Sequence, residues 1–150
     1  TIEVINGNLF THGGIYPALA QTDLSIKSLN EITRKNYYKP YFNKKNQNQT
    51  VGLLTSPKTS PYWYRGYFKN ELSLEEIEMS LHRYNAKTVI VGHTIQPKVN
   101  RSYNGKVIGI DVKHPADDYE YLPNVQSEGL MIDNGSYYRV FANGEIESLK

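Results

Sequence analysis

The stretch that decides the fold reads Thr88-Val89-Ile90-Val91-Gly92-His93-Thr94. Its first four residues form a short, continuous apolar run, typical of a strand buried on both faces of a sheet. The run ends at Gly92-His93, and ligands of open α/β sheets bind at the carboxyl ends of strands. The sequence therefore predicts an α/β fold with a functional site at this strand end.

A helix is predicted directly before this strand. Ser73 and Glu76 form a Ser-x-x-Glu capping box, which satisfies amide donors at a helix start. Leu74, Ile77 and Leu81 have the spacing of one buried helical face.

A second strand with a histidine at its end is predicted near the start of the chain. Residues 3–5 and 8–11 flank the turn pair Asn6-Gly7, which readily takes positive φ and favours a tight hairpin. The second of these strands runs into His12-Gly13-Gly14. Further along, Leu24, Leu29 and Ile32 indicate another helix.

The remainder of the chain divides into one irregular stretch and a β-rich end. Residues 34–69 are rich in Lys, Arg and Tyr, and they read as a long loop. Residues 106–112 alternate like a strand. Residues 114–125 read as an acidic loop, whose first residue, His114, is a further candidate for the site. The last predicted elements are three antiparallel strands (130–132, 137–141 and 145–149) separated by Asn-Gly turns.

Composition excludes several classes of protein. The chain is 39% hydrophobic and 21% charged, which is typical of a soluble globular protein, and it has no apolar run long enough to cross a membrane. A formal net charge of +2 gives no argument for nucleic acid. The absence of cysteine excludes disulfides and thiolate metal sites. We expect no membrane partner and favour a cytoplasmic location. The opening at Thr1, without Met, reads as though the chain were cut from something longer.

Two histidines follow predicted strands in matching surroundings. His12 precedes Gly13-Gly14, and His93 follows Gly92. Histidines at two strand ends can converge on one point, and imidazole nitrogen binds Zn, Mn or Fe well. Adjacent glycines let a bound phosphate approach the backbone. The alternative is that each histidine only satisfies a hydrogen bond beside a turn.

Three short motifs, in order, resemble those of one enzyme family. Residues 9–15, LFTHGGI, look like the fourth motif of calcineurin-like metallophosphoesterases, and residues 91–94, VGHT, look like the fifth. Residues 60–67, SPYWYRGY, resemble a segment of the bacterial, Shewanella-like branch of phosphoprotein phosphatase relatives.

The resemblance implies a metal-dependent phosphatase of the Ser/Thr type. His12 and His93 would ligate one metal of a pair of divalent ions (Mn, Fe or Zn), and Arg65 would bind the substrate phosphate bidentately. Asp111 could orient a ligand histidine or, equally, cap a turn. A metal-bridging hydroxide would attack phosphorus. The substrate would be a phosphoprotein or a small phosphoester.

Departures from the family pattern limit this expectation. Ile95 stands where many members have a second histidine, a change shared with protein phosphatase relatives. The family's Asp-x-His, Gly-Asp-x-x-Asp-Arg and Gly-Asn-His motifs do not precede the His-Gly-Gly strand here. We therefore expect residues 1–150 to be the C-terminal half of one layered α/β/β/α sandwich domain. That half would be inactive alone, and its exposed apolar face would favour self-association.

A different class of function remains open beside this one. Interleaved aromatic and basic residues in the stretch 34–69 could stack bases and bind the phosphates of single-stranded nucleic acid. The alternative to an enzyme is therefore a non-catalytic binding module. Acidic residues at the helix start and in the loop 114–125 argue against nucleic acid.

Overall fold

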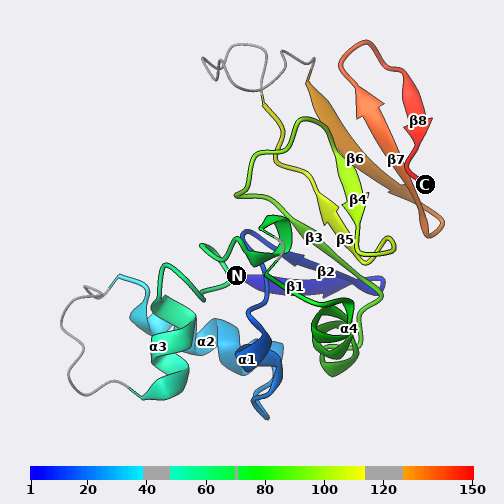
Figure 1. Ribbon diagram of the computed structural model, residues 1–150. Coiled ribbons are helices and arrows are strands. Elements are labelled where there is room, and N and C mark those ends of the chain that lie inside the picture. Colours follow the sequence, from blue (N-terminus) through cyan, green and yellow to red (C-terminus); the bar gives the residue numbers. More distant parts are fainter. Residues whose placement is uncertain (39–47, 70, 114–126) are drawn as a thin grey trace.

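The computed structural model describes residues 1–38, 48–69, 71–113 and 127–150 and has a mixed α/β architecture (Figure 1). A five-stranded mixed sheet has the order β1-β2-β3-β5-β4, and a three-stranded antiparallel sheet has the order β6-β7-β8. The strands are β1 (Ile2–Ile5), β2 (Asn8–Thr11), β3 (Thr88–Val91), β4 (Asn100–Ser102), β5 (Val107–Gly109), β6 (Glu128–Asp133), β7 (Ser136–Phe141) and β8 (Ile146–Ser148).

The helices gather on one side of the five-stranded sheet (Figure 1). They are α1 (Pro17–Ala20), α2 (Ile26–Asn36), α3 (Gln49–Thr55), α4 (Leu74–Arg83) and the short 3-10 helix η1 (Gly66–Phe68). The predicted capping box at the start of α4 is confirmed, because the side chain of Ser73 accepts from the Glu76 amide while the Glu76 carboxylate accepts from the Ser73 amide.

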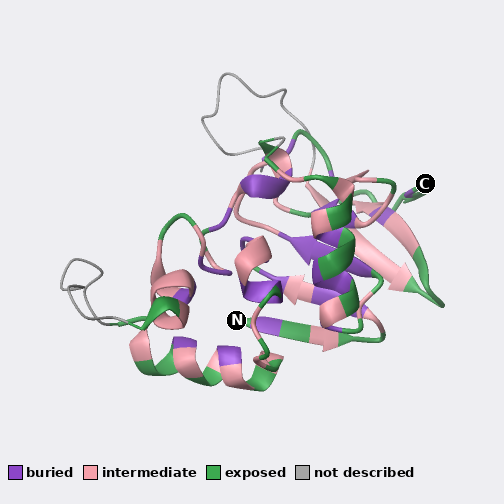
Figure 2. Ribbon diagram, turned by 60° about the horizontal axis from the view of Figure 1, so that its bottom comes forward, coloured by how far each residue is buried: buried purple, intermediate pink, exposed green. Residues whose placement is uncertain are grey.

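Parallel pairing at the centre of the sheet follows from the burial of its strands. β3 pairs in parallel with β2 on one side and with β5 on the other, and all four of its residues are buried (Figure 2). Side chains alternate between two layers, as the pleat requires. Leu9, Val89 and Val91 pack with the helices, whereas Ile90 and Ile108 pack with residues of the three-stranded sheet.

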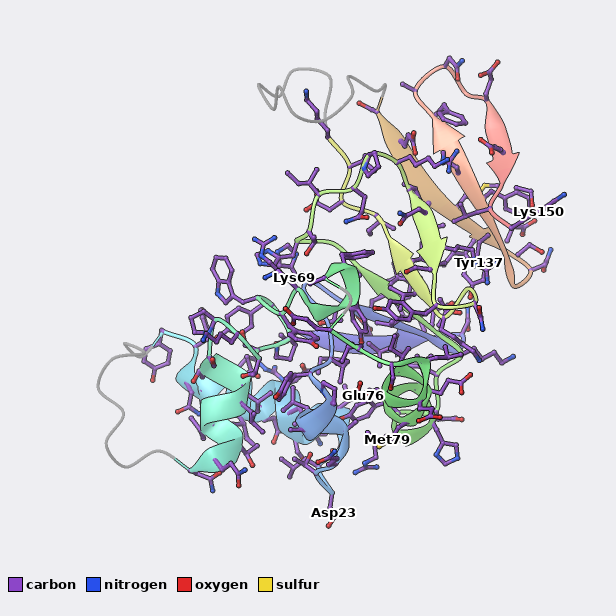
Figure 3. The ribbon with its side chains drawn as sticks, viewed as in Figure 1. Asp23, Lys69, Glu76, Met79, Tyr137 and Lys150 are labelled. Atoms are coloured by element: carbon purple, nitrogen blue, oxygen red, sulfur yellow. The ribbon has the colours of Figure 1, made fainter. Side chains whose placement is uncertain are left out.

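The three-stranded sheet is joined to the five-stranded sheet through polar contacts. The Tyr137 hydroxyl donates to Oδ1 of Asn8 at 2.5 Å, and Figure 3 labels Tyr137 where β7 approaches the first sheet. Arg139 and Glu128, an ion pair at 3.1 Å within the three-stranded sheet, both bond to the backbone of Val99, which directly precedes β4. The Arg139 guanidinium donates to the Val99 carbonyl at 2.8 Å, and the Glu128 carboxylate accepts from the Val99 amide at 2.9 Å. We call these contacts the seam between the two sheets.

The structure confirms the α/β class, the first hairpin, the helix beginning after Ser73 and the C-terminal three-stranded meander. It corrects the long irregular stretch, because α3 and η1 form within residues 34–69, and it adds β4, which the sequence did not predict. The acidic loop and His114 lie outside the described residues. Within the described ranges, no helix combines the length and apolarity needed to cross a membrane.

Candidate functional site

Three parallel strands bring three candidate side chains to one edge of the sheet. Thr11 of β2 is in register with Val91 of β3, so His12 and His93 follow their strands at neighbouring positions. Asp111 follows β5, which is parallel to β3. A Cβ placed on Gly92 would lie 3.7 Å from Nδ1 of His12 and 3.9 Å from Cβ of Asp111, so these groups surround Gly92. The structure therefore brings the predicted residues together.

The two imidazoles are in contact. The ring centroids of His12 and His93 are 4.8 Å apart, with the ring planes tilted by 54°. His93 has a φ of +62°, a left-handed conformation that costs a non-glycine residue roughly 1–3 kcal/mol and is concentrated at functional sites. Its Nε2 is buried and finds no hydrogen-bond partner among the described residues. A strained residue with an unsatisfied ring nitrogen indicates a ligand-binding role.

The surroundings of His93 favour its neutral form. Burial lowers its pKa below the ordinary value of 6.5, and the nearby charges of Arg65 and His12 lower it further, while Asp111 and a hydrogen bond to the Trp63 backbone act in the opposite direction. A neutral imidazole keeps a lone pair on one ring nitrogen. His93 can therefore accept a proton or a hydrogen bond at neutral pH.

The loop before η1 is docked onto the end of β2 by a single carbonyl. The amides of Gly13 and Gly14 donate to the Pro61 carbonyl at 2.6 and 3.1 Å, and the Thr11 hydroxyl donates to it at 2.9 Å. A Cβ on Gly13 would lie 2.7 Å from the backbone nitrogen of Tyr64. We expected this glycine to leave room for a bound phosphate, but at Gly13 the space beside the backbone is filled by the loop. The loop backbone occupies that space, and Gly13 is needed for docking.

Docking of this loop delivers Arg65 and Trp63 to the histidines. Nη1 of Arg65 donates to the His93 carbonyl at 2.6 Å. The Trp63 ring meets the His93 ring edge to face, with centroids 4.9 Å apart. Within the described part of the chain, Arg65 has no carboxylate within ion-pair distance. Its remaining N–H groups are available to an anion.

The sequence did not single out two residues of this site. Pro61 and Trp63 lie inside the SPYWYRGY motif, which was used only for Arg65. Because Trp63 is only two residues from Arg65 in the motif, the sequence could have indicated that Trp63 also lies at the site. The remaining described histidine, His82, is exposed on α4, away from this site.

The site does not fit the expected pair of divalent ions. Among residues 1–38, 48–69, 71–113 and 127–150, no group of three or more His, Cys, Asp or Glu side chains is placed to hold a metal ion. His12 and His93 supply two donors, whereas divalent ions in proteins take four or more. The cationic Arg65 at His93 adds a charge that disfavours a cation further.

The candidate site of this α/β fold therefore has two imidazoles at the carboxyl ends of parallel strands and the guanidinium of Arg65, which the loop before η1 brings to His93. Solved structures with the same fold are phosphatases. A cold-active protein-tyrosine phosphatase of a psychrophilic Shewanella species matches the whole chain with 28% identity and a TM-score of 0.81. A point mutant of a cold-active protein tyrosine phosphatase matches with 28% identity and a TM-score of 0.82, and another structure of such an enzyme with 27% and 0.82.

Sequence comparison gives a more distant relative. An uncharacterized protein of Acanthamoeba polyphaga mimivirus is 26% identical over 117 residues, which are 67% of this chain and 46% of that protein. No family model matches the chain. The chain covers 43%, 43% and 42% of the three solved chains, so it spans less than half the length of each protein it matches.

These findings correct the assignment that the motifs suggested. The matched solved proteins are named protein-tyrosine phosphatases, and the described residues offer no metal-binding group. The calcineurin-like metallophosphoesterase family, the dinuclear metal site and the Mn, Fe or Zn cofactors are therefore withdrawn. The coarser class, a phosphatase fold, stands.

Proposed function

We propose that the protein containing this chain hydrolyses phosphate monoesters, and that His12, His93 and Arg65 form its phosphate site. The observation that carries the proposal is the buried, unpartnered Nε2 of His93 beside the guanidinium of Arg65. Whole-chain similarity to phosphatases at 27–28% identity supports it.

Each side chain has a role that its chemistry allows. Arg65, held by the His93 carbonyl, would direct its free N–H groups at two phosphate oxygens and stabilise the charge of the transition state. Neutral His93 would accept a proton from the attacking water through its unpartnered ring nitrogen. His12, in contact with His93, would donate to a phosphate oxygen. Asp111, near His12, would orient that ring.

The proposed substrates carry an aryl phosphate. The solved neighbours are protein-tyrosine phosphatases, and Trp63 is 48% exposed beside His93, where its face can meet a phenyl ring. The 150 residues contain no cysteine, so this chain supplies no thiolate nucleophile, and water is the proposed attacking group.

We also propose that residues 1–150 form the C-terminal part of a larger layered domain, inactive alone. The solved chains that it matches are more than twice as long. A cavity of about 750 Å³ opens beside His12, lined among others by Phe10, Ile90 and the exposed Ile110. Further chain would cover this apolar face. Size-exclusion chromatography of the isolated chain tests this, since an uncovered face should drive self-association and a strict monomer would contradict it.

The central test is hydrolysis by the intact protein of p-nitrophenyl phosphate and of a phosphotyrosine peptide. Arg65→Lys removes bidentate geometry and keeps the charge, and His93→Asn keeps a residue tolerant of positive φ. We expect each change to lower kcat/KM by about 100-fold or more, as for loss of one transition-state donor or proton acceptor.

The matched control is His82→Gln, because His82 is an exposed imidazole on α4. It should leave kcat/KM unchanged. Parallel assays in EDTA and in added divalent cations will show directly whether groups outside this chain bring an ion to the reaction. Normal turnover by Arg65→Lys and His93→Asn would exclude this site. An inert wild type under every condition would favour a non-catalytic binding module.

A further inference from the structure

A second cavity lies next to the proposed phosphate site and shares Trp63 and Arg65 with it. It has a volume of about 540 Å³ and is lined by Pro57, Lys58, Trp63, Tyr64, Arg65, Lys69 and Glu71. This size is in the range of small-ligand sites. Arg65 and Trp63 belong to both places, because they also contact His93. A ligand at the histidines can therefore extend into this cavity.

The lining is cationic. The cavity wall carries three cationic side chains (Lys58, Arg65 and Lys69) and one carboxylate, that of Glu71. Among the described residues, none of these three cations lies within 4.0 Å of a carboxylate oxygen, since the ion pairs there involve Lys106 and Arg139 instead. Lys58 and Lys69 are exposed, and Figure 3 labels Lys69 beside η1. Unpaired cations around a concave surface attract anions.

The floor of the cavity is rigid and aromatic. Tyr64 is buried and packs edge to face against Tyr16 and Tyr67. Burial raises the Tyr64 pKa above its ordinary value, and nearby Tyr67 and Glu71 raise it further, so the phenol stays neutral. Tyr64 therefore adds no negative charge to the cavity.

We propose that this cavity is a second anion subsite, which binds an acidic group carried by the same phosphoester whose phosphate binds at Arg65 and His93. The acidic group would be a carboxylate beside a phosphotyrosine or a second phosphate of a small molecule. Lys58 and Lys69 bind it, and Trp63 separates the two anions. The proposal rests on the proposed function in placing the first phosphate at Arg65.

Calorimetric titration of the intact protein tests the subsite without turnover. One arm compares peptides that carry a phosphonomethyl-phenylalanine, a non-hydrolysable phosphotyrosine mimic, flanked either by Glu or by Gln. The other arm compares benzylphosphonate with p-xylylene bisphosphonate. The variants are the double change Lys58→Gln/Lys69→Gln and the control Lys150→Gln. Lys150 is an exposed lysine that lies far from Lys69, beside the three-stranded sheet (Figure 3).

We expect the wild type to bind the acidic member of at least one pair about five- to tenfold more tightly, as two partly exposed ion pairs allow. The double variant should lose this preference and keep its affinity for the neutral-flank or single-phosphonate probe. Lys150→Gln should retain the preference, and added salt should weaken it. The arm that shows the preference identifies the source of the second anion.

Equal binding of both members in both arms would overturn the subsite, as would a preference that survives Lys58→Gln/Lys69→Gln. The failure of the proposed function looks different. If acidic probes are preferred while no phosphoester is hydrolysed, the subsite stands and the proposed hydrolysis fails. If hydrolysis is normal and the preference is absent, only the subsite fails.

Discussion

The two sheets of this molecule are built in opposite ways. The five-stranded sheet pairs β3 in parallel with β2 and with β5, so that strands 80 residues apart (Asn8 and Thr88) and 18 residues apart (Val89 and Val107) in sequence lie side by side. In the three-stranded sheet each strand pairs antiparallel with its neighbour in sequence, and β8 is fully exposed. Only the first sheet has neighbouring parallel strands, whose carboxyl ends lie side by side, and the proposed site lies there. The second sheet is local in sequence and is attached through the seam and through an apolar cluster that includes Ile90 and Ile108.

The largest expected effect is at the seam, with Arg139→Ala. The side chains of Arg139 and Glu128 are only 9% and 5% exposed, and Arg139 also donates to the Val99 carbonyl. Removal of the arginine leaves the buried Glu128 carboxylate without its cation and with only the Val99 amide as a partner, which costs about 3–5 kcal/mol. Urea unfolding of the wild type and the variant measures the difference.

Glu147→Gln is the control for this prediction. The Glu147 carboxylate accepts from Arg139 at 2.8 Å but is 60% exposed, so its loss should cost less than about 1 kcal/mol. A cost for Arg139→Ala as small as that of Glu147→Gln would show that the contacts of Arg139 with Glu128 and Val99 do not stabilise the protein.

The next prediction concerns the five-stranded sheet, at the end of β2 where the loop containing Pro61 is docked. Gly13→Ala would place a Cβ 2.7 Å from the Tyr64 nitrogen and 2.8 Å from the Tyr64 carbonyl oxygen. Backbone atoms cannot move aside cheaply, so we expect a loss of about 1–3 kcal/mol. The shift of the loop should also carry Arg65 away from His93 and weaken phosphonate binding about tenfold or more, as measured by calorimetry.

Gly52→Ala is the matched control, since Gly52 lies in α3 and a Cβ there would meet nothing within 4 Å. Alanine in a helix should stabilise by up to about 1 kcal/mol and leave binding unchanged. Wild-type phosphonate affinity in Gly13→Ala would contradict the docking role of Gly13.

The same difference between the sheets explains what could be predicted from the sequence. Hairpins with Asn-Gly turns, the capping box at Ser73 and the apolar run at residues 88–91 are local signals, and the elements they predict are present. By contrast, β4 is a three-residue strand without an apolar pattern, and it was not predicted although the Asn104-Gly105 turn joins it to β5.

The site was predictable in part for a related reason. His12 and His93 each follow a recognisable strand, so their convergence could be inferred. The docking of Pro61 on Gly13, which brings Arg65 to His93, spans about 50 residues and has no local pattern. The glycine pair was visible in the sequence, but its role depended on a partner that only the structure identifies.

A smaller effect concerns α4, which covers the five-stranded sheet. Ser73→Ala removes the side-chain oxygen that accepts from the Glu76 amide and should cost about 1 kcal/mol. Thermal or urea unfolding measures the loss. Ser73→Asp should restore most of the stability, because Asp is an equally good N-cap residue. A loss that Asp does not restore would mean that the capping box is not the cause.

The smallest expected effect is a pH dependence of the stability that arises at the first sheet, from His93. His93 has a pKa below its ordinary value of 6.5 in the folded protein, because of burial and the charges of Arg65 and His12. The unfolded chain then binds more protons, so stability is fully present above about pH 6.5 and is lost as the pH falls through the lowered pKa. The urea midpoint should therefore drop between pH 7.5 and pH 5 by less in His93→Asn than in the wild type.

His82→Gln, at an exposed position on α4, should follow the wild type. Identical profiles of the urea midpoint against pH for the wild type and His93→Asn would show that the acid sensitivity arises elsewhere. The strand edge of the first sheet would then contribute no more than the second sheet to the pH dependence of stability.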